Sequence, residues 1–396
     1  MKKYVKRTVE KELLMAAREF PVVILTGARQ TGKSTLLKHI FKKYSYVTLD
    51  YPDIRKFAKE DPALFFEKYN SPLIIDEIQY APELLEYIKI IVDNNRNKNG
   101  QFILTGSQHF NLMKGVSESL AGRASIHNLL GLSLEELKVS SEKLNLNITF
   151  DSIFKGFYPD VAIHNVRNST YYASYLQTYL DRDIRQILSV QDLSVFHNYL
   201  ELLAARVGSI LNLNEMSKKC GISFPTAKRW LSLLEATQII YLLRPYYKNI
   251  SKRVIKSPKL YFYDTGLLAY ILKYQSSEML QSGPLAGIFF ENLIIIELLK
   301  KKVNKGYNYA LYYFRDSNKN EVDVIIEYNG VFQLIEIKMA KTMKKAFATT
   351  LKKIAPLIPN SHASVISFNR NNLPLSKNIS SLFWYDFIKK IGELKL

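Results

Sequence analysis

Short apolar runs alternate with amphipathic stretches over the first 105 residues. The runs are rich in Val, Ile and Leu and are bounded by polar residues, which predicts buried strands. These strands are expected at residues 21–25, 44–50, 72–79 and 101–105. A helix over Lys6–Glu19 precedes them, and Pro62 divides the helical stretch at 52–69. Strands that alternate with helices form a parallel sheet with covered faces, so the sequence predicts an α/β domain.

The later parts of the chain have other patterns. Residues 129–149 predict a strand or turn and then a polar helix, and an irregular stretch places the first domain boundary near Asn165. Helices dominate from there to residue 240. The last third predicts a helix, a strand, a hairpin, a helix over 341–355 and a strand, in that order. We therefore expect three domains, at residues 1–165, 166–270 and 271–396.

Length and charge narrow the classes of function. A chain of 396 residues exceeds the ~250–300 at which a single core stops growing. Lys and Arg outnumber Asp and Glu by 55 to 36, and the net charge of +19 favours a polyanionic partner, DNA first. An AT-rich genome, which inflates Lys, Asn, Ile and Tyr, is the alternative explanation. Cys220 is the single cysteine, which excludes an internal disulfide, and no run approaches 18 apolar residues. We therefore expect a cytoplasmic protein without a membrane span.

The loop after the first strand fits G-x-x-x-x-G-K-[ST]. Its residues are Gly27, Ala28, Arg29, Gln30, Thr31, Gly32, Lys33, Ser34 and Thr35. The glycines let backbone amides point at a phosphate, and the N-terminus of the next helix adds about half a positive charge. Lys33 would reach the β and γ phosphates of ATP, and Ser34 would bind Mg²⁺. A glycine-rich turn that merely joins strand to helix is the alternative.

Two acids end the third predicted strand. Asp76 would hold Mg²⁺ together with Ser34, and Glu77 would polarise the attacking water, as phosphoryl transfer requires. The fourth predicted strand ends in polar side chains, namely Thr105, Ser107 and Gln108. If this strand lies beside the other two, one of these side chains can sense the γ phosphate, and we choose Ser107. An ordinary turn at the end of a strand is the alternative.

Four segments, GARQTGKST, LIIDEIQ, LTGSQ and SLAGR, together resemble the AAA-type ATPases of a widespread prokaryotic family. The resemblance covers nearly the whole chain and implies that a winged-helix region and a restriction-endonuclease-like domain follow the ATPase domain. It also implies that Arg123 of SLAGR is an arginine finger, although an arginine in a loop more often pairs locally. The sequence leaves open whether such a finger acts in its own subunit or on a neighbour in a homo-oligomer.

Residues 211–240 have the form of a helix-turn-helix. Gly221 permits the turn and Ser223 caps the second helix, which would expose Lys228 and Arg229 to bases or phosphates. The following segment resembles a basic wing without any acid. Its basic residues are Arg244, Lys248, Lys252, Arg253, Lys256 and Lys259. Winged helices also dock proteins, so a protein partner is the alternative to DNA.

Two strands in the last third flank Asn329-Gly330, the strongest two-residue hairpin signal. A type I′ turn there sets Asp323 opposite Glu336, with Lys338 on the same face of the ribbon. Like charges directly opposed cost stability unless a metal ion or a lysine compensates. That cost is the physical reason to suspect chemistry at this hairpin.

The arrangement of Asp323 and then Glu336-x-Lys338 resembles the PD-(D/E)xK nucleases. The resemblance implies that Glu291, Asp323 and Glu336 bind Mg²⁺ and that Lys338 helps to orient the attacking water. A surface hairpin in a Lys- and Glu-rich protein also produces so short a motif by chance.

These observations predict an Mg²⁺-dependent, ATP-binding and ATP-hydrolysing AAA-type protein that couples ATP turnover to DNA binding or processing. The alternative is a nucleotide-dependent switch that binds a protein partner and has an inactive nuclease-like domain. The predicted fold class is α/β. It comprises a P-loop NTPase parallel sheet, a helical and winged-helix domain, and an α/β restriction-endonuclease-like domain.

Overall fold

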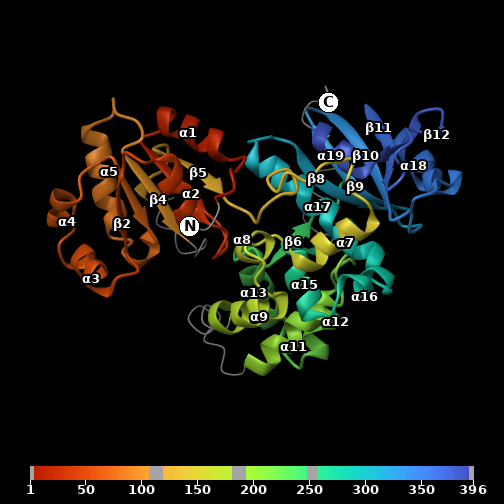
Figure 1. The fold of residues 1–396 in the computed structure, drawn as a ribbon, viewed down its shortest axis with the longest axis horizontal. Coiled ribbons are helices and arrows are strands. Elements are labelled where there is room, and N and C mark those ends of the chain that lie inside the picture. Colours follow the sequence, from red (N-terminus) through yellow and green to blue (C-terminus); the bar gives the residue numbers. More distant parts are fainter. Residues whose placement is uncertain (1–3, 107–118, 181–192, 248–256, 392–396) are drawn as a thin grey trace. The chain divides into compact units, whose positions relative to one another are not determined.

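The computed structural model describes residues 4–106, 119–180, 193–247 and 257–391 (Figure 1). Ser107 and residues 248–256 of the basic segment lie outside the described residues. The chain divides into two compact units, which are described one at a time. The first contains residues 1–132, 236–238 and 303–306, and the second contains residues 133–235, 239–302 and 307–396.

A five-stranded parallel sheet in the order β2-β3-β4-β1-β5 forms the centre of the first unit. Its strands are β1 (Val22–Thr26), β2 (Ser45–Thr48), β3 (Leu73–Asp76), β4 (Phe102–Gly106) and β5 (Ala124–Asn128). Its helices are α1 (Glu10–Glu19), α2 (Lys33–Ile40), α3 (Pro52–Glu60), α4 (Pro62–Lys68), the 3₁₀ helix η1 (Ile78–Tyr80) and α5 (Leu84–Asn94). The predicted parallel sheet is confirmed, and β4 lies between β1 and β3. The sequence did not indicate β5 because this half-buried edge strand has no apolar run.

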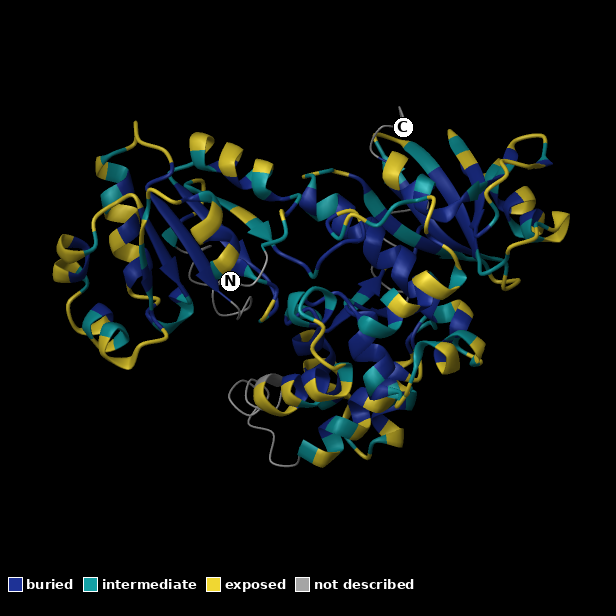
Figure 2. Cartoon of the chain, in the orientation of Figure 1, coloured by how far each residue is buried: buried dark blue, intermediate teal, exposed yellow. Residues whose placement is uncertain are grey.

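Successive residues of β1 face opposite sides of the sheet. Val22 and Ile24 belong to one core with α3, α4 and α5, whereas Val23 and Leu25 belong to another with α1 and α2. Both faces are therefore covered, which explains why β1 is apolar throughout instead of alternating. Figure 2 shows the strands of this sheet buried and the outward faces of α3 and α4 exposed.

The second unit begins with helices. They are α7 (Leu146–Lys155), α8 (Pro159–Ala162), α9 (Asn168–Tyr175), the π-helix η2 (Leu176–Leu180), α11 (Leu193–Ala204), α12 (Leu213–Lys219), α13 (Phe224–Ala236), α15 (Thr265–Ile271) and α16 (Ser277–Ser282). The two helices and the turn predicted for residues 211–240 are present as α12 and α13. Gly221 has a φ of 65°, and Ser223 Oγ accepts a hydrogen bond from Thr226 N–H at 3.2 Å. An antiparallel pair, β6 (Ile240–Leu243) and β7 (Lys259–Phe262), follows.

Six strands in the order β12-β13-β11-β10-β9-β8 form the sheet of the second unit. They are β8 (Ala310–Arg315), β9 (Glu321–Tyr328), β10 (Val331–Lys338), β11 (Ser361–Ser367), β12 (Pro374–Ser376) and β13 (Ile379–Phe383). The accompanying helices are α17 (Ala286–Asn304), η3 (Lys345–Ala348), α18 (Thr349–Ile354), η4 (Ala355–Leu357) and α19 (Trp384–Lys390). The type I′ hairpin is confirmed, because Asn329 and Gly330 have φ values of 49° and 79° and Val331 pairs with Tyr328.

Some predictions about the second unit are wrong. Residues 133–144 form turns instead of a polar helix, because Lys138 takes a left-handed φ of 55° that ends the first turn. The division between the two compact units lies near Leu132, and Leu134 N–H donates to Glu297 of the second unit at 3.0 Å. The helix expected over 341–355 is reduced to α18 flanked by 3₁₀ helices. Residues of the second and third expected domains fall in the same compact unit, and the division into three domains stays a prediction.

No helix among the described residues is long and apolar enough to cross a membrane.

Candidate functional site

The glycine-rich loop joins the end of β1 to the start of α2. Gly27 has a φ of 145°, and a Cβ there would lie 2.3 Å from Leu129 O, so only glycine fits. Gln30 and Gly32 also take positive φ values, of 61° and 92°. No described side chain caps α2 at Gly32. The first amides of α2 are therefore placed for a phosphate, as at other helix N-termini.

Lys33 is buried at the start of α2. Its Nζ donates to Gly27 O at 2.9 Å and to Ala28 O at 3.0 Å. Burial lowers the pKa of Lys33 below its usual value, and the carboxylates of Glu77 and Asp76 oppose this shift. The ammonium thus lies between the loop backbone and two acids from a different strand, where phosphate oxygens would complete its hydrogen bonding.

Two side chains that the sequence did not indicate hold the loop in place. Arg7 is buried, and its guanidinium donates to Thr31 O at 3.0 Å and to Leu130 O at 2.7 Å. Gln238, from a short segment of the same unit, accepts a hydrogen bond from Ala28 N–H at 3.0 Å. Neither residue belongs to a recognisable motif, so only the folded structure indicates them.

Asp76 ends β3 and receives hydrogen bonds from both neighbouring strands. Thr105 Oγ1, at the end of β4, donates to Asp76 Oδ1 and accepts from Glu77 N–H at 3.2 Å. Tyr46 OH, on β2, donates to Asp76 Oδ2 at 2.5 Å. Thr105, one of the three candidate γ-phosphate sensors, therefore contacts both Asp76 and Glu77. Ser107, our choice, lies in the part of the chain that the structure does not describe.

The predicted Mg²⁺ ligands converge on one side chain. Burial and the carboxylate of Asp76 raise the pKa of Tyr46, and the hydroxyl of Ser34 acts on the same phenol in the opposite direction. Ser34 and Asp76 therefore both interact with Tyr46, and their hydroxyl and carboxylate oxygens are ligands that Mg²⁺ accepts. The residues present fit the ion.

Glu77 follows Asp76 in an unusual backbone conformation. Its φ and ψ are 59° and 45°, a left-handed region that residues other than glycine seldom adopt. Such conformations cluster at functional sites. The side chain of Gln79 donates to the Glu77 carboxylate. Burial and the carboxylates of Glu77 and Asp76 raise the pKa of Asp50. Asp50 is therefore a third acid near the site.

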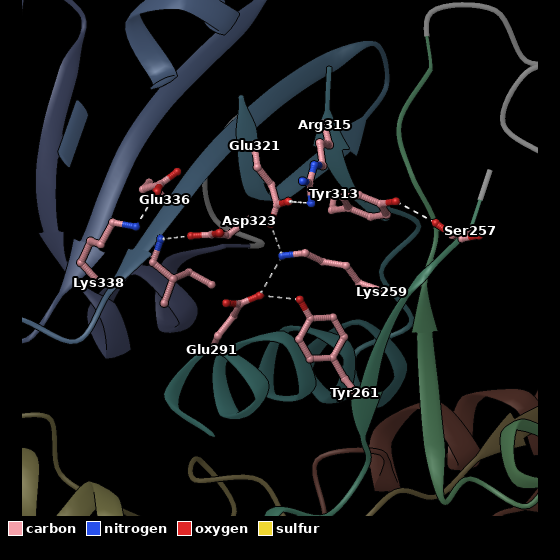
Figure 3. Close-up of polar contacts among 11 residues, drawn as sticks. Ser257, Lys259, Tyr261, Glu291, Tyr313, Arg315, Glu321, Asp323, Glu336 and Lys338 are labelled. Atoms are coloured by element: carbon pink, nitrogen blue, oxygen red, sulfur yellow. Dashed lines mark hydrogen bonds and ion pairs between the residues drawn. The ribbon is translucent and has the colours of Figure 1, made fainter. Parts of the chain in front are cut away.

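A second group of acids lies in the second unit, between α17 and the hairpin (Figure 3). Lys259 Nζ, from β7, bonds Glu321 at 2.6 Å and Glu291 at 3.2 Å, and Tyr261 OH donates to the same Glu291 oxygen at 2.5 Å. The structure therefore corrects the prediction that Lys259 belongs to an exposed basic wing. Its side chain is 3% exposed because it enters this carboxylate cluster.

Glu291, Asp323 and Glu336, the three acids of the predicted nuclease-like site, interact electrostatically. Burial and the carboxylates of Glu291 and Glu336 raise the pKa of Asp323 well above its usual range. Burial also raises the pKa of Glu336, while the ammonium of Lys338, 2.5 Å from it, opposes the shift. Asp323 Oδ2 accepts from Ile337 N–H at 2.7 Å.

These acids do not fit a metal ion as they stand. Within the described ranges, no group of three or more His, Cys, Asp or Glu side chains is placed to hold one. One oxygen of each of the three acids already accepts a hydrogen bond, from Lys259, from Lys338 or from a backbone amide.

Comparisons with known proteins identify the first unit. Residues 19–138, which contain the glycine-rich loop and both acids of β3, match the family model described as AAA domain. The first unit is an AAA-type P-loop ATPase domain. Residues 148–278 and 286–385 match two models described as domains of unknown function (DUF8612 and DUF4143).

Relatives of the whole chain exist in mycobacteria. Over 373 residues, the chain is 28% identical to the uncharacterized proteins Rv2008c of Mycobacterium tuberculosis and Mb2031c of Mycobacterium bovis. These matches cover 91% of this chain and 82% of each relative. The Walker-type ATPase PABY2304 of Pyrococcus abyssi is 16% identical with a TM-score of 0.46, covering 68% of this chain and 96% of that one.

Arg123 of the AAA domain pairs with a local acid. Its guanidinium donates to both oxygens of Asp93 on α5, at 2.8 Å and 2.9 Å. Arg123 precedes β5, whose first residue pairs with Val22 at the beginning of β1. The glycine-rich loop follows the other end of β1, roughly 16 Å away for a strand of this length. Arg123 is therefore far from the loop of its own subunit.

The helix-turn-helix keeps two of its predicted basic residues on the surface. Lys228 and Arg229, in the first part of α13, are exposed. Arg244, predicted for the wing, pairs with Glu235 at 3.1 Å. With Lys259 buried as well, both described members of the predicted wing are engaged by carboxylates.

Proposed function

We propose that the AAA domain hydrolyses ATP with Mg²⁺ and that the second unit couples this turnover to DNA binding or processing. The observation that carries the first half is the convergence of Lys33, Asp76, Glu77 and Thr105 from α2, β3 and β4 at one edge of the parallel sheet. Carboxyl ends of parallel strands are where such sheets bind ligands.

Each of these residues has a distinct role in the proposal. The loop amides and Lys33 bind the phosphates, and Lys33 stabilises the charge that develops on them. Glu77 orients and polarises the attacking water. The hydroxyl of Thr105 fixes the positions of Asp76 and Glu77 relative to each other, because it donates to Asp76 and accepts from Glu77 N–H. Mg²⁺, held by Ser34 and Asp76, would neutralise phosphate charge when bound. Arg123 acts, in this proposal, on the nucleotide of a neighbouring subunit.

Fewer observations support coupling to DNA than support ATP hydrolysis. The net charge of +19 and the exposed Lys228 and Arg229 favour a polyanionic partner. The wing contributes less than its composition suggests, because Arg244 and Lys259 are ion-paired. The DNA proposal therefore depends mainly on α13.

Steady-state ATP hydrolysis with Mg²⁺ tests the proposal. We expect Lys33→Ala to reduce the rate of hydrolysis at least about a hundredfold, because it removes a positive charge that stabilises the transition state. We expect duplex or single-stranded DNA to increase the rate of the wild-type protein. A rate that survives Lys33→Ala would contradict the first half.

Two matched variants test the DNA surface. Lys228→Gln should weaken retardation of duplex DNA and lower the slope of log affinity against log salt by about 1. Lys273→Gln is the control, because Lys273 is equally a surface lysine of the second unit but is paired with Glu201 at 3.2 Å. Absence of retardation even at low salt would exclude DNA as the partner.

The alternative function is a nucleotide-dependent switch for a protein partner, with an inactive nuclease-like domain. The ammonium of Lys259 between Glu291 and Glu321 favours this inactive state, because these acids are not free to hold a catalytic metal ion. A Lys33-dependent rate that is indifferent to DNA, without Mn²⁺-dependent cutting, is the result expected from this alternative.

A further inference from the structure

The cation at the centre of the carboxylate cluster is part of the protein. Lys259 reaches Glu321 and Glu291 from β7, a strand that pairs with β6 and lies outside the six-stranded sheet (Figure 3). Its side chain is almost completely buried, and a buried ammonium is stable only when it is paired. Burial alone would lower the pKa of Lys259, but Glu291, Asp323 and Glu321 raise it, so the side chain stays charged.

The cluster needs this charge. Four carboxylates, those of Glu291, Glu321, Asp323 and Glu336, act on one another here. Besides Lys259, the cations in contact with them in the described part of the chain are Lys338, paired with Glu336, and Arg315, paired with Glu321 at 3.3 Å. Without Lys259 the excess negative charge would rise from one to two in a buried site. Such an excess is relieved by protonation or by a bound cation.

One oxygen in the cluster is left without a protein donor. Glu336 Oε2 is buried and has no hydrogen-bond partner among the described residues, and the Glu336 side chain is 10% exposed. Glu291 Oε1 accepts from Lys259 and Tyr261, Asp323 Oδ2 from a backbone amide, and Glu336 Oε1 from Lys338. A divalent cation needs several oxygens at once. Here it would have to share the carboxylate of Glu291 with the ammonium of Lys259, which repels it.

We infer that Lys259 is the resident cation of this cluster and that it excludes a divalent cation from the Glu291, Asp323 and Glu336 site in the wild-type protein. An ammonium and a dication on the same carboxylates repel each other at contact distance, and this repulsion opposes binding of the dication. Lys259 also joins β7 to α17 and β9 by its two ion pairs. The inference does not depend on ATP hydrolysis, because every group involved lies in the second unit.

Mn²⁺ binding to the full-length chain without nucleotide tests this inference. Each protein is titrated beside the same protein carrying Glu291→Gln, so that ions bound by the AAA domain cancel in the difference. For the wild type we expect no difference. For Lys259→Met we expect one additional Mn²⁺ per chain that Glu291→Gln abolishes, with at least a tenfold gain in affinity over the wild type.

Thermal unfolding gives a second readout. Lys259→Met should lower the melting temperature, and millimolar Mn²⁺ should restore part of the loss. Lys300→Met is the matched control, because Lys300 is as deeply buried on α17 and pairs with Glu297 at 2.8 Å, outside the carboxylate cluster. Its loss of stability should not respond to Mn²⁺.

Two results would overturn the inference. One is a folded Lys259→Met protein that binds no more Mn²⁺ than the wild type. The other is a wild-type protein that binds an Mn²⁺ which Glu291→Gln removes. If Lys259→Met does not fold, the wild-type comparison decides alone, since equal binding with and without Glu291→Gln supports the inference and unequal binding contradicts it.

Discussion

The hydroxyl of Thr105 offers a sharp test of the ATPase site. Thr105 is fully buried at the end of β4, where it donates to Asp76 and accepts from Glu77 N–H. Thr105→Val keeps the β-branched shape and removes only these two hydrogen bonds. Thr105→Ser keeps the hydroxyl and loses only a methyl group. The pair of variants therefore separates hydrogen bonding from packing.

The size of the effect follows from the partners. A hydrogen bond to a charged group is worth about 1.5–3 kcal/mol. If that interaction serves to hold Asp76 in its productive position, its loss raises the barrier by the same amount. Each ~1.4 kcal/mol is a factor of ten in rate, so Thr105→Val should turn over ATP about ten- to a hundredfold more slowly. The unpaired Glu77 amide should also cost about 1–3 kcal/mol of stability.

Phosphate release at saturating ATP, over a range of Mg²⁺ concentrations, measures the effect. Thr105→Val should need more Mg²⁺ to reach half of its maximal rate, and Thr105→Ser should stay close to the wild type. Thr26→Val is the control, because Thr26 is equally buried on β1 but donates to His127 O at 3.1 Å, away from Asp76. Equal turnover in the two valine variants would refute the role assigned to Thr105.

Two further predictions concern Asp76 of the first unit, through its donor Tyr46, and Asp323 of the second unit. Tyr46→Phe also removes a donor from Asp76, but Tyr46 is only partly buried and water can replace it, so turnover should fall by no more than about fivefold in the same assay. Asp323→Asn should raise the melting temperature by about 2–4 °C at pH 8, and the gain should vanish near pH 4. The sign follows because burial and neighbouring acids raise the pKa of Asp323 in the folded state, so the wild type loses stability as pH rises above the ordinary value of ~3.9. A melting temperature that falls at pH 8 would contradict this reasoning.

Local sequence determined the parts of the structure that were predicted well. The phosphate loop is a nine-residue motif, and its glycines take the positive φ values that the motif implies. The hairpin register follows from a two-residue turn, so the pairing of Val331 with Tyr328 could be stated without a structure. In both cases the interacting residues are close in sequence, and few alternative arrangements compete.

Contacts between residues that are far apart in the chain could not be predicted from the sequence. Arg7 contacts Leu130 across more than a hundred residues, and nothing in the basic N-terminal stretch distinguishes it from its neighbours. The sensor position depends on how β3 and β4 align, which places Thr105 beside Asp76. Arg123 lacked any sequence signal for its ion pair with Asp93, because the partner lies on a different element.

Lys259 shows why a short acidic motif does not settle whether a site binds a metal ion. The motif counts the acids on the hairpin, whereas the outcome depends on which cation reaches them, and here that cation comes from a strand that precedes α17 in the chain. Composition assigned this lysine to a DNA-binding wing, and the fold uses it to neutralise carboxylates. The same contacts explain why residues of the two expected C-terminal domains fall in one compact unit. Backbone bonds support this, since Tyr246 N–H donates to Tyr313 O at 2.7 Å and so joins the segment after β6 to β8. A change that removes Lys259 should therefore affect metal affinity and the cohesion of the unit together.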